Sequence, residues 1–489
     1  MPSQSSVSRH APDGLILAIA CVAQFMVVLD VSVVNVALPD MGRDLHFTTT
    51  GAQWVVNAYV LTFAGFLLLG GRAADLIGRR RVYLAGVVLF TLASIGAGFA
   101  HTGSQMIVAR AIQGLGGAIL SPATLTLIVT TFKGPQLAKA IGAWSAVAGA
   151  GGAVGGLLGG VLTGWASWRW VFFINVPFGV VAVTVAALYL RELRNSGATV
   201  KLDITGAILV TGSLTALIFG VVSSATTSWS SPSVVLTVAG GLVGIGLFIL
   251  WELRVASHPL VPFRLFRSRP LSVANIVMIL VGGAFFAMWY FLTYFFQGTL
   301  GYGAVAAGVA FLPMAVAIII GAQISSRLLV RVGVRPLLLV GAALASGGFY
   351  ALAHLSVHST YAASVLGPSV MCAFAMGLLF SPLATAATAG VDRADAGLAS
   401  GVLNTSRQVG GSLSLAILGT VAADRTRALA LAAHGSPKAL AEAPVAGYSR
   451  AFAISALVTV VAFAVAWALP HRTGRTARAT DSPLAAEAV

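Results

Sequence analysis

One carboxylate of this 489-residue chain lies inside a long apolar run, where its chemistry would be unusual. Of the 14 acidic residues, Asp30 is the one placed clearly within such a run, in AQFMVVLDVSVVNVALP. If that run crosses a bilayer, the ionised acid costs about 3 kcal/mol, and loss of water favours the neutral, protonated form. Asp30 is therefore a candidate for loading and releasing protons. The alternative is that it is a structural partner of a buried arginine.

Arg110 is the cation best placed to meet Asp30, and it lies in the fourth apolar run, in MIVARAIQGLGGA. At about 1.5 Å per helical residue, Asp30 lies roughly 12 Å and Arg110 roughly 8 Å from the same end of their predicted helices, so the two could meet. A nearby cation favours the ionised acid and desolvation opposes it. Competition between them could couple proton release to a conformational change. The alternative to this ion pair is that the Arg110 guanidinium extends outward to the lipid headgroups.

A cluster of charge follows the second apolar run, in GRAADLIGRRR at residues 71–81. Retention of positive charge in the cytoplasm explains the arginines, but it does not explain an aspartate between two glycines. The pattern indicates a tight turn with a charge latch between two helix ends. The residues of this predicted latch are Gly71, Asp75, Gly78, Arg79 and Arg80.

Glycines recur at every fourth position in the apolar run at 138–164, which makes two ladders on a helix. The ladders are Gly151, Gly155, Gly159 and Gly152, Gly156, Gly160. Such faces let helices approach closely and slide, so a gating role and ordinary helix packing are both open. Because these glycines do not follow a strand, a dinucleotide-binding loop is excluded.

The elements that position these residues are membrane-spanning helices. Apolar residues make up 58% of the chain and charged residues 9%, against about 25% charged in soluble domains, which argues against a water-soluble fold. Runs of about 20 apolar residues, the length that spans a bilayer, recur throughout. We expect fourteen spans, at 14–38, 52–71, 82–100, 105–128, 138–164, 170–190, 204–224, 233–253, 272–297, 305–329, 336–354, 361–390, 401–423 and 449–470.

These spans fall into two groups of six with a pair between them. We predict an all-α membrane protein with an N-terminal six-helix bundle at 14–190, two inserted helices at 204–253 and a C-terminal six-helix bundle at 272–470. A weak echo of the charged turn, SSRLLVRVGVR, ends the tenth span, which indicates that the two halves are related.

The placement of lysine and arginine predicts the orientation. With both termini in the cytoplasm, six of the 29 basic residues face outward, and three of those lie in one long loop at 424–448. The outward ones are Arg43, Arg169, Arg425, Arg427, Lys438 and Arg450. The net charge of +15 therefore lies mostly toward the cytoplasm, which explains a basic protein without nucleic acid as a partner.

Aromatic residues near Asp30 and in the ninth span predict an apolar substrate cavity. The residues we assign to it are Phe25, Met26, Trp54, Tyr59, Trp289 and Tyr290. Aromatic rings beside one carboxylate suit lipophilic cations, through burial and cation–π contact. Belts of Trp and Tyr at the membrane interface explain several of these residues equally well.

At these motifs the chain resembles the major facilitator superfamily, and within it the fourteen-span drug:proton antiporters. The motifs that carry the resemblance are LDVSVVNVALP, GRAADLIGRRR, RAIQGLGGA, GAWSAVAGAGGAVGGLLGG, WRWVFFINVPFG and SRQVGGSLS. The resemblance implies that Asp30 couples proton or cation movement and that Arg110 with Gln113 relays protonation. It also implies an inner latch of Asp75 with Arg79 and Arg80, and an exporter-type glycine motif in the fifth span.

We therefore expect proton-coupled efflux of hydrophobic or cationic small molecules, such as drugs, antibiotics or dyes, by alternating access in the cell membrane. The alternative is a dedicated metabolite carrier of the same fold. An enzyme is disfavoured, because His101, His354 and His358 lie at the outer face, away from any intramembrane acid. We predict no metal site and no cofactor. The expected partners are the substrate, protons and the lipid bilayer, and we expect a monomer.

Overall fold

The computed structural model describes residues 12–190, 202–391 and 395–469, and the regular elements in these ranges are helices. The first are α1 (Asp13–Asp44), α2 (Thr49–Ile77), α3 (Arg79–Gly98), α4 (Gly103–Thr131), α5 (Gly134–Trp165), α6 (Trp170–Phe173) and α7 (Asn175–Tyr189). The next are α8 (Ile204–Ser224) and α9 (Pro232–Arg254). The remainder are η1 (Phe263–Arg267), α10 (Arg269–Tyr294), η2 (Phe295–Thr299), α11 (Ala304–Ala310), α12 (Leu312–Val332), α13 (Val334–Leu352), η3 (Tyr361–Val365), α14 (Leu366–Thr388), α15 (Ala396–Ala432) and α16 (Pro437–Ala466).

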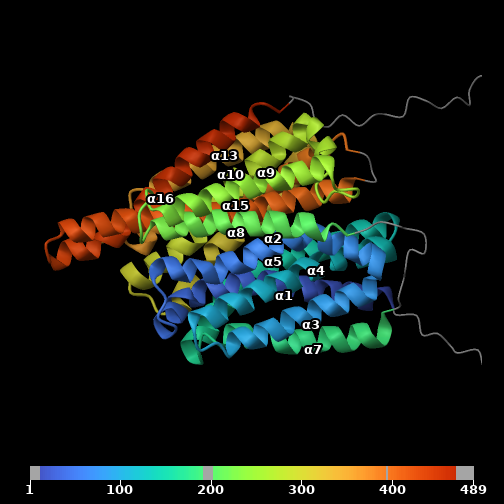
Figure 1. The fold of residues 1–489 in the computed structure, drawn as a ribbon, viewed down its shortest axis with the longest axis horizontal. Coiled ribbons are helices and arrows are strands. Elements are labelled where there is room, and N and C mark those ends of the chain that lie inside the picture. The colour runs from blue at the N-terminus through green and yellow to red at the C-terminus, as the bar shows by residue number, and fades with distance from the viewer. Residues whose placement is uncertain (1–11, 191–201, 392–394, 470–489) are drawn as a thin grey trace, which may run out of the picture.

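Twelve helical segments of the described residues are long and apolar enough to cross a bilayer. They coincide with twelve of the fourteen predicted spans. The other two predictions, at 138–164 and 401–423, fall on α5 and α15, which have 32 and 37 residues and run alongside the rest (Figure 1). A polar stretch, from Asn404 to Gln408, lowers the apolarity of α15.

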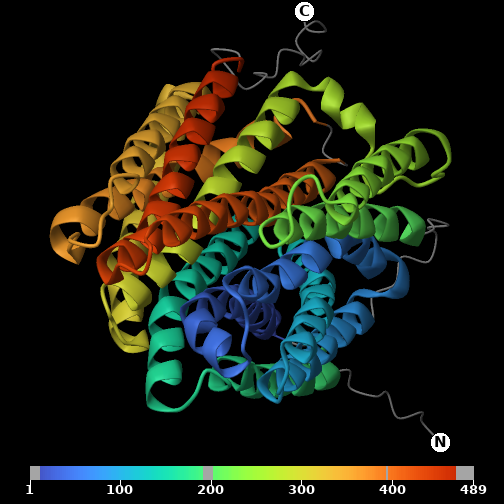
Figure 2. The ribbon, with the colours of Figure 1, turned by 60° about the vertical axis from the view of Figure 1, so that its left-hand side comes forward.

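Two groups of helices lie side by side (Figure 2). In the first, α4 packs against α2 and α3, and α1 packs against α5. In the second, α10 packs against α15, and α14 against α12 and α13. The groups meet mainly where α2 contacts α15 and where α5 contacts α11.

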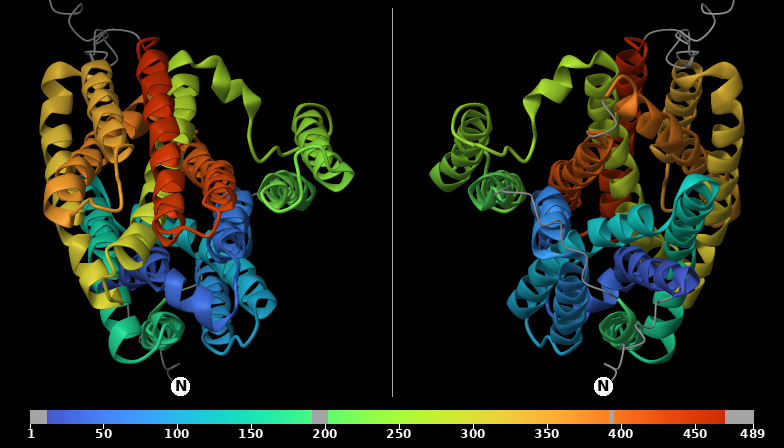
Figure 3. Two further views of the ribbon diagram at one scale, coloured as in Figure 1. Left: turned by 90° about the vertical axis from the view of Figure 1, so that its left-hand side faces the viewer. Right: turned by 90° about the vertical axis from the view of Figure 1, so that its right-hand side faces the viewer.

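The hairpin of α8 and α9 lies at the side of the molecule, where α8 contacts both α2 and α15 (Figure 3). Its outward surface is apolar: Leu236, Val243 and Leu247 on α9 are 71%, 62% and 52% exposed. An apolar surface of this kind is stable against lipid and unfavourable in water.

Single glycines make the same connection in both groups. Gly78, at φ 113°, joins α2 to α3, and Gly333, at φ 81°, joins α12 to α13. Both conformations disfavour residues with a Cβ, so the echo between the two charged turns has a backbone reason. The predicted turn was too wide, because α2 continues to Ile77 and Gly71 lies inside it, facing Pro122 of α4.

The prediction of a long loop at 424–448 is wrong. There α15 continues to Ala432 and α16 begins at Pro437, so two helices extend beyond the bundle and turn between residues 433 and 436 (Figure 1). The segment is rich in Ala and Leu, which favour helix in water as well as in lipid. The apolar pattern ends where the residues become more polar, near residue 423, whereas the helix itself continues to Ala432.

The bundle has two ends, called the Trp165 end and the Gly78 end after a residue that lies at each. At the Trp165 end, α1 and α5 finish close together, and the Arg169 guanidinium, just after α5, lies 2.7 Å from the Asp44 carboxylate at the end of α1. The Gly78 end is the opposite one.

Candidate functional site

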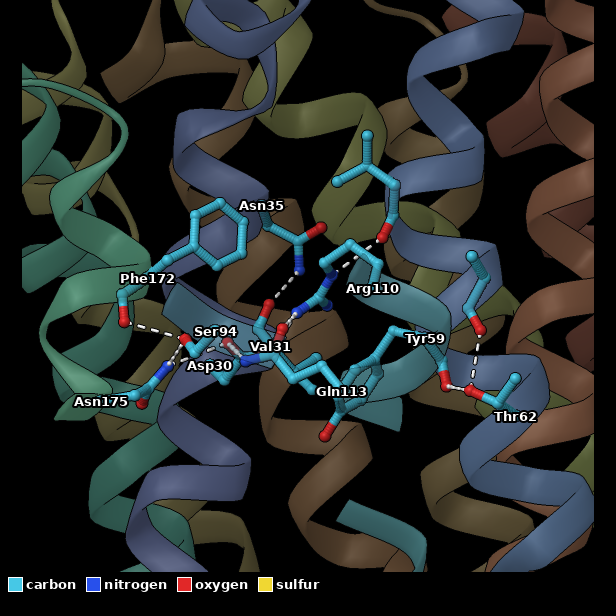
Figure 4. A network of polar contacts seen from close by, with 12 residues as sticks. Asp30, Val31, Asn35, Tyr59, Thr62, Ser94, Arg110, Gln113, Phe172 and Asn175 are labelled. Carbon is cyan, nitrogen blue, oxygen red and sulfur yellow. Dashed lines mark hydrogen bonds and ion pairs between the residues drawn. The ribbon is translucent and has the colours of Figure 1, made fainter. Parts of the chain in front are cut away.

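Asp30 forms a buried ion pair with Arg110. The Arg110 NH1 atom lies 2.5 Å from Asp30 Oδ2, and the two side chains are 1% and 0% exposed (Figure 4). The predicted meeting of α1 and α4 at these residues is confirmed. Since Arg110 is enclosed, the alternative in which it extends to lipid headgroups is wrong.

Two neutral side chains also donate to the Asp30 carboxylate, and a third, Ser94, accepts a hydrogen bond from one of them. The Gln113 amide donates to Asp30 Oδ1 at 2.7 Å, and its own oxygen accepts from Arg110 NH1 at 2.7 Å. The Asn175 amide donates to the same Oδ1 at 3.1 Å and to the Ser94 hydroxyl oxygen at 3.0 Å. Ser94 in turn donates to the Phe172 carbonyl at 2.8 Å (Figure 4). These donors satisfy the hydrogen-bonding capacity of the buried carboxylate that water would otherwise satisfy.

Asn175 and Ser94 were not predicted as site residues. The predicted span at 170–190 breaks at Ile174 into α6 and α7, which places Asn175 at the first position of α7, facing α1. The available signal was an amide inside the apolar motif WRWVFFINVPFG. Buried polar groups in a membrane rarely occur without a partner.

Arg110 is held from three further directions. Its Nε donates to the Val55 carbonyl of α2 at 3.0 Å, and its guanidinium lies 4.3 Å from the centre of the Tyr59 ring and 5.8 Å from that of Phe172. The Tyr59 hydroxyl and the Asn175 side-chain oxygen have no hydrogen-bond partner among the described residues. The network therefore couples α1, α2, α4 and α7 through one ion pair.

The six residues predicted for a substrate cavity do not gather at one place. Phe25 packs edge-on against Phe178 of α7 at 5.7 Å, whereas Trp54 faces Phe219 of α8 at 6.0 Å, toward the hairpin. Trp289 lies 5.0 Å from Phe311. The other three, Met26, Tyr59 and Tyr290, are buried within the helix packing.

The two glycine ladders of α5 contact different helices. Gly151, Gly155 and Gly159 lie against α1; a Cβ on Gly159 would come within 2.7 Å of the Val33 carbonyl oxygen. Gly156 and Gly160 lie against α11 of the other group, and a Cβ on Gly160 would lie 2.4 Å from the Ala304 carbonyl oxygen. Gly152 has looser surroundings, with Val28 at 3.9 Å from the same test position.

Contacts between the two groups at the Trp165 end include a polar one. The Gln297 amide of η2 donates to the Val36 carbonyl of α1 at 2.8 Å. Together with the packing of Gly160 on Ala304, it holds the two groups together at that end.

At the Gly78 end, two arginines of the predicted latch region bind backbone. Arg80 donates to the Ala187 carbonyl in the last turn of α7 at 2.7 Å, a favourable position for a cation. Arg72 donates to the carbonyls of His258 and Pro259, which follow α9. The Asp75 side chain lies outside the described residues, so the latch of Asp75 with Arg79 and Arg80 stays a prediction.

Within the described part of the chain, no three His, Cys, Asp or Glu side chains gather where a metal could bind. Cys21 and Cys372 are both free thiols.

Residues 20–415 match the sequence profile described as Major Facilitator Superfamily. The cephamycin export protein of Amycolatopsis lactamdurans is 42% identical over 428 residues, covering 87% of this chain and 87% of that protein. The puromycin resistance protein of Streptomyces alboniger is 39% identical over 474 residues, covering 95% and 93%. A bacterial homologue of the human lysosomal transporter Spinster, solved inward-facing and unoccupied, aligns with a TM-score of 0.65 at 16% identity, covering 93% and 97%, a likeness of fold.

Proposed function

Because this chain belongs to the major facilitator superfamily, a family of membrane transporters and not of enzymes, we propose that it is a proton-coupled antiporter that exports small molecules. Its relatives include export and resistance proteins for antibiotics. The observation that carries the proton coupling is the Asp30 carboxylate, fully buried and bonded to Arg110, Gln113 and Asn175.

Proton coupling follows from how this network must respond to a proton. A proton on Asp30 removes the charge that holds the Arg110 guanidinium, and Arg110 links α4 to α1 and to the Val55 carbonyl of α2. Protonation therefore weakens contacts among three helices at once, which biases the bundle toward a different arrangement. Deprotonation restores them.

The alternating movement that we propose uses the contact between α5 and α11. Gly156 and Gly160 bring the backbones of these helices together near the Trp165 end, and small residues let such a contact open and re-form. At the Gly78 end, Asp75 with Arg79 and Arg80 is the proposed latch of the opposite state. The moving units are the predicted bundles at 14–190 and 272–470.

The proposed membrane arrangement has fourteen crossings, with α5 and α15 added to the twelve apolar segments, since both run parallel to them. The Gly78 end carries most of the lysines and arginines, so we assign it and both termini to the cytoplasm. The proposed unit is a monomer.

The proposed substrates are hydrophobic molecules, among them antibiotics, as for the relatives. The argument for a cationic substrate loses its main support, because the Asp30 carboxylate is already bound by Arg110, Gln113 and Asn175. A dedicated carrier of one metabolite is the alternative.

Purified protein in liposomes that contain a pH-sensitive dye tests the proposal. Adding puromycin, other antibiotics, or dyes on one side should move protons in the opposite direction, and several compounds should do so. A response to one compound alone would favour the dedicated carrier, and proton movement that no compound changes would contradict antiport. Asp30→Asn should lose this proton movement. Its matched control is Asp424→Asn, the same acid-to-amide change on α15 where that helix extends beyond the bundle.

A further inference from the structure

A second arginine lies deep in the bundle, on α15. Arg407 is 11 residues from the first residue of that helix, or roughly 17 Å along it. Its guanidinium donates from Nε at 3.2 Å and from NH2 at 2.8 Å to the same acceptor, the Asn404 side-chain oxygen. The Phe380 ring of α14 lies 5.9 Å away, and Gly282 of α10 lies against the arginine stem.

Arg407 has no acidic partner among the described residues. The ion pairs found there join Arg43 with Asp40, Arg110 with Asp30, Arg169 with Asp44, Arg264 with Asp395 and Arg427 with Asp424. Nor does any described residue accept a hydrogen bond from its NH1 atom. A cation at this depth is unfavourable unless water, hydrogen bonds or an opposite charge compensates it. Helix packing alone therefore does not explain why an arginine occupies this position.

The Arg407 side chain is not completely enclosed, although α15 is surrounded by other helices. It is of intermediate exposure, as are its neighbours Asn404, Thr405 and Gln408. Its nearest neighbours from other helices are Gly282 of α10 and the Phe380 ring of α14, so the side chain lies between α10 and α14. Gly410 and Gly411, one turn on, are buried against Ile279 and Phe286 of α10.

We propose that Arg407 is a substrate-binding residue for a carboxylate, so that the exported molecules include amphipathic acids or zwitterions. The proposal rests on the export function above and narrows its substrate class. A guanidinium presents a planar fork of N–H groups that matches a carboxylate, and only Nε and NH2 are used by Asn404. Phe380 and the Phe286 ring, which packs against Gly411, supply apolar surface for the rest of the molecule.

The arrangement also selects against cations. With the Asp30 carboxylate enclosed by its own partners, the accessible charge is that of Arg407, and it repels a positively charged substrate. The expected order of affinity is therefore acid, then neutral ester, then lipophilic cation.

Equilibrium binding to the purified full-length protein in lipid nanodiscs tests this order without a proton gradient. The probes are benzylpenicillin, its methyl ester and tetraphenylphosphonium. In the wild type we expect the acid to bind at least about tenfold tighter than the ester, and the cation most weakly. Arg407→Gln should remove the preference for the acid. Arg407→Lys, which keeps the charge but not the fork, should retain part of it.

Arg331→Gln, which removes an exposed arginine at the Gly78 end of α12, is the matched control and should leave the order unchanged. Equal binding of acid and ester by the wild type, binding of neither, or a loss in Arg407→Gln that is the same for both would overturn the proposal. If Arg407→Gln does not fold, Arg407→Lys decides by its reduced acid preference. Acid preference without proton-driven export would count against the proposed function alone, and export of acid and ester at equal rates would count against Arg407 alone.

Discussion

Two arginines, Arg110 and Arg407, lie inside the two groups of helices but have different surroundings. Arg110 is 1% exposed and meets a carboxylate, an amide, a backbone carbonyl and an aromatic face. Arg407 is partly exposed and meets one amide oxygen and a distant ring. Both lie in motifs that combine arginine, glutamine and glycine, RAIQGLGGA and SRQVGGSLS, so the motif alone does not distinguish them.

The different surroundings of the two arginines suit two separate tasks of an exporter, proton exchange and substrate binding. A charged side chain whose partners all belong to the protein can respond to a proton, but it has no unused hydrogen-bonding group for a substrate. A charged side chain that lacks an opposite charge in the protein can bind an oppositely charged substrate. We infer that the first group of helices holds the proton site and the second holds the charge that recognises the substrate, so the two ligands need not compete for one side chain.

The largest expected effect is on stability and distinguishes the two arginines directly. Arg110→Gln leaves the Asp30 carboxylate buried without its cation, so the free energy of unfolding should fall by about 3–5 kcal/mol. Arg407→Gln removes a cation that has no acidic partner and should change it by about 1 kcal/mol or less. Thermal unfolding of both variants in one detergent measures the difference. Equal losses would contradict the contrast between the two sites.

A next, smaller effect follows from giving Arg407 an acidic partner of its own. Asn404→Asp would place a carboxylate where the amide oxygen now accepts from Arg407 at 2.8 Å. The affinity for benzylpenicillin should fall about tenfold, because the guanidinium is then neutralised within the protein. Asn404→Ala, which adds no charge, serves as the control and should keep the preference for the acid. An unchanged affinity in Asn404→Asp would show that Arg407 does not contact the substrate.

The Asn175 amide is expected to contribute less than the ion pair. Asn175→Ala removes one donor from Asp30 and one from Ser94, so unfolding should become easier by about 1–2 kcal/mol. The control is Asn35→Ala, which removes an amide that donates only to the Val31 carbonyl of its own helix. Thermal unfolding measures both. A larger loss in Asn35→Ala would place Asn175 outside the network.

Tyr59 should show the smallest effect, because its ring and its hydroxyl behave differently. The hydroxyl has no partner among the described residues, so Tyr59→Phe should change stability by less than about 0.5 kcal/mol. Tyr59→Leu removes the ring that faces Arg110 at 4.3 Å and should lose about 1–2 kcal/mol. If both variants lose the same amount, the ring does not stabilise the cation.

Much of this architecture could be predicted from composition and from isolated charges. Apolar runs placed the helices because twenty residues fit a bilayer, and Asp30 with Arg110 could be paired because two opposite charges at similar depth in hydrocarbon are expected to meet. A turn at Gly78 was predicted from the charged cluster, although the helix before it is longer than predicted. The weak basic echo at the end of the tenth span contains Gly333, which joins two helices in the same way.

Other features depend on three-dimensional contacts that apolarity does not encode. Asn175 reaches Asp30 because α7 packs beside α1 with this amide facing the carboxylate, a contact between helices far apart in the sequence. Trp54 turns toward the α8–α9 hairpin, whose position beside α2 and α15 had no signal in the sequence. The helices beyond residue 423 continue because alanine and leucine favour helix outside the membrane too.

The central claim is that the Asp30 carboxylate exchanges its proton in each transport cycle. It is tested most directly by Asp30→Asn in liposomes, comparing uphill antibiotic transport driven by a pH gradient with exchange of labelled for unlabelled antibiotic at equal pH. We expect the variant to lose the uphill transport and to keep the exchange, because an amide cannot carry the proton but leaves the substrate route intact. Uphill transport at the wild-type level would contradict the account.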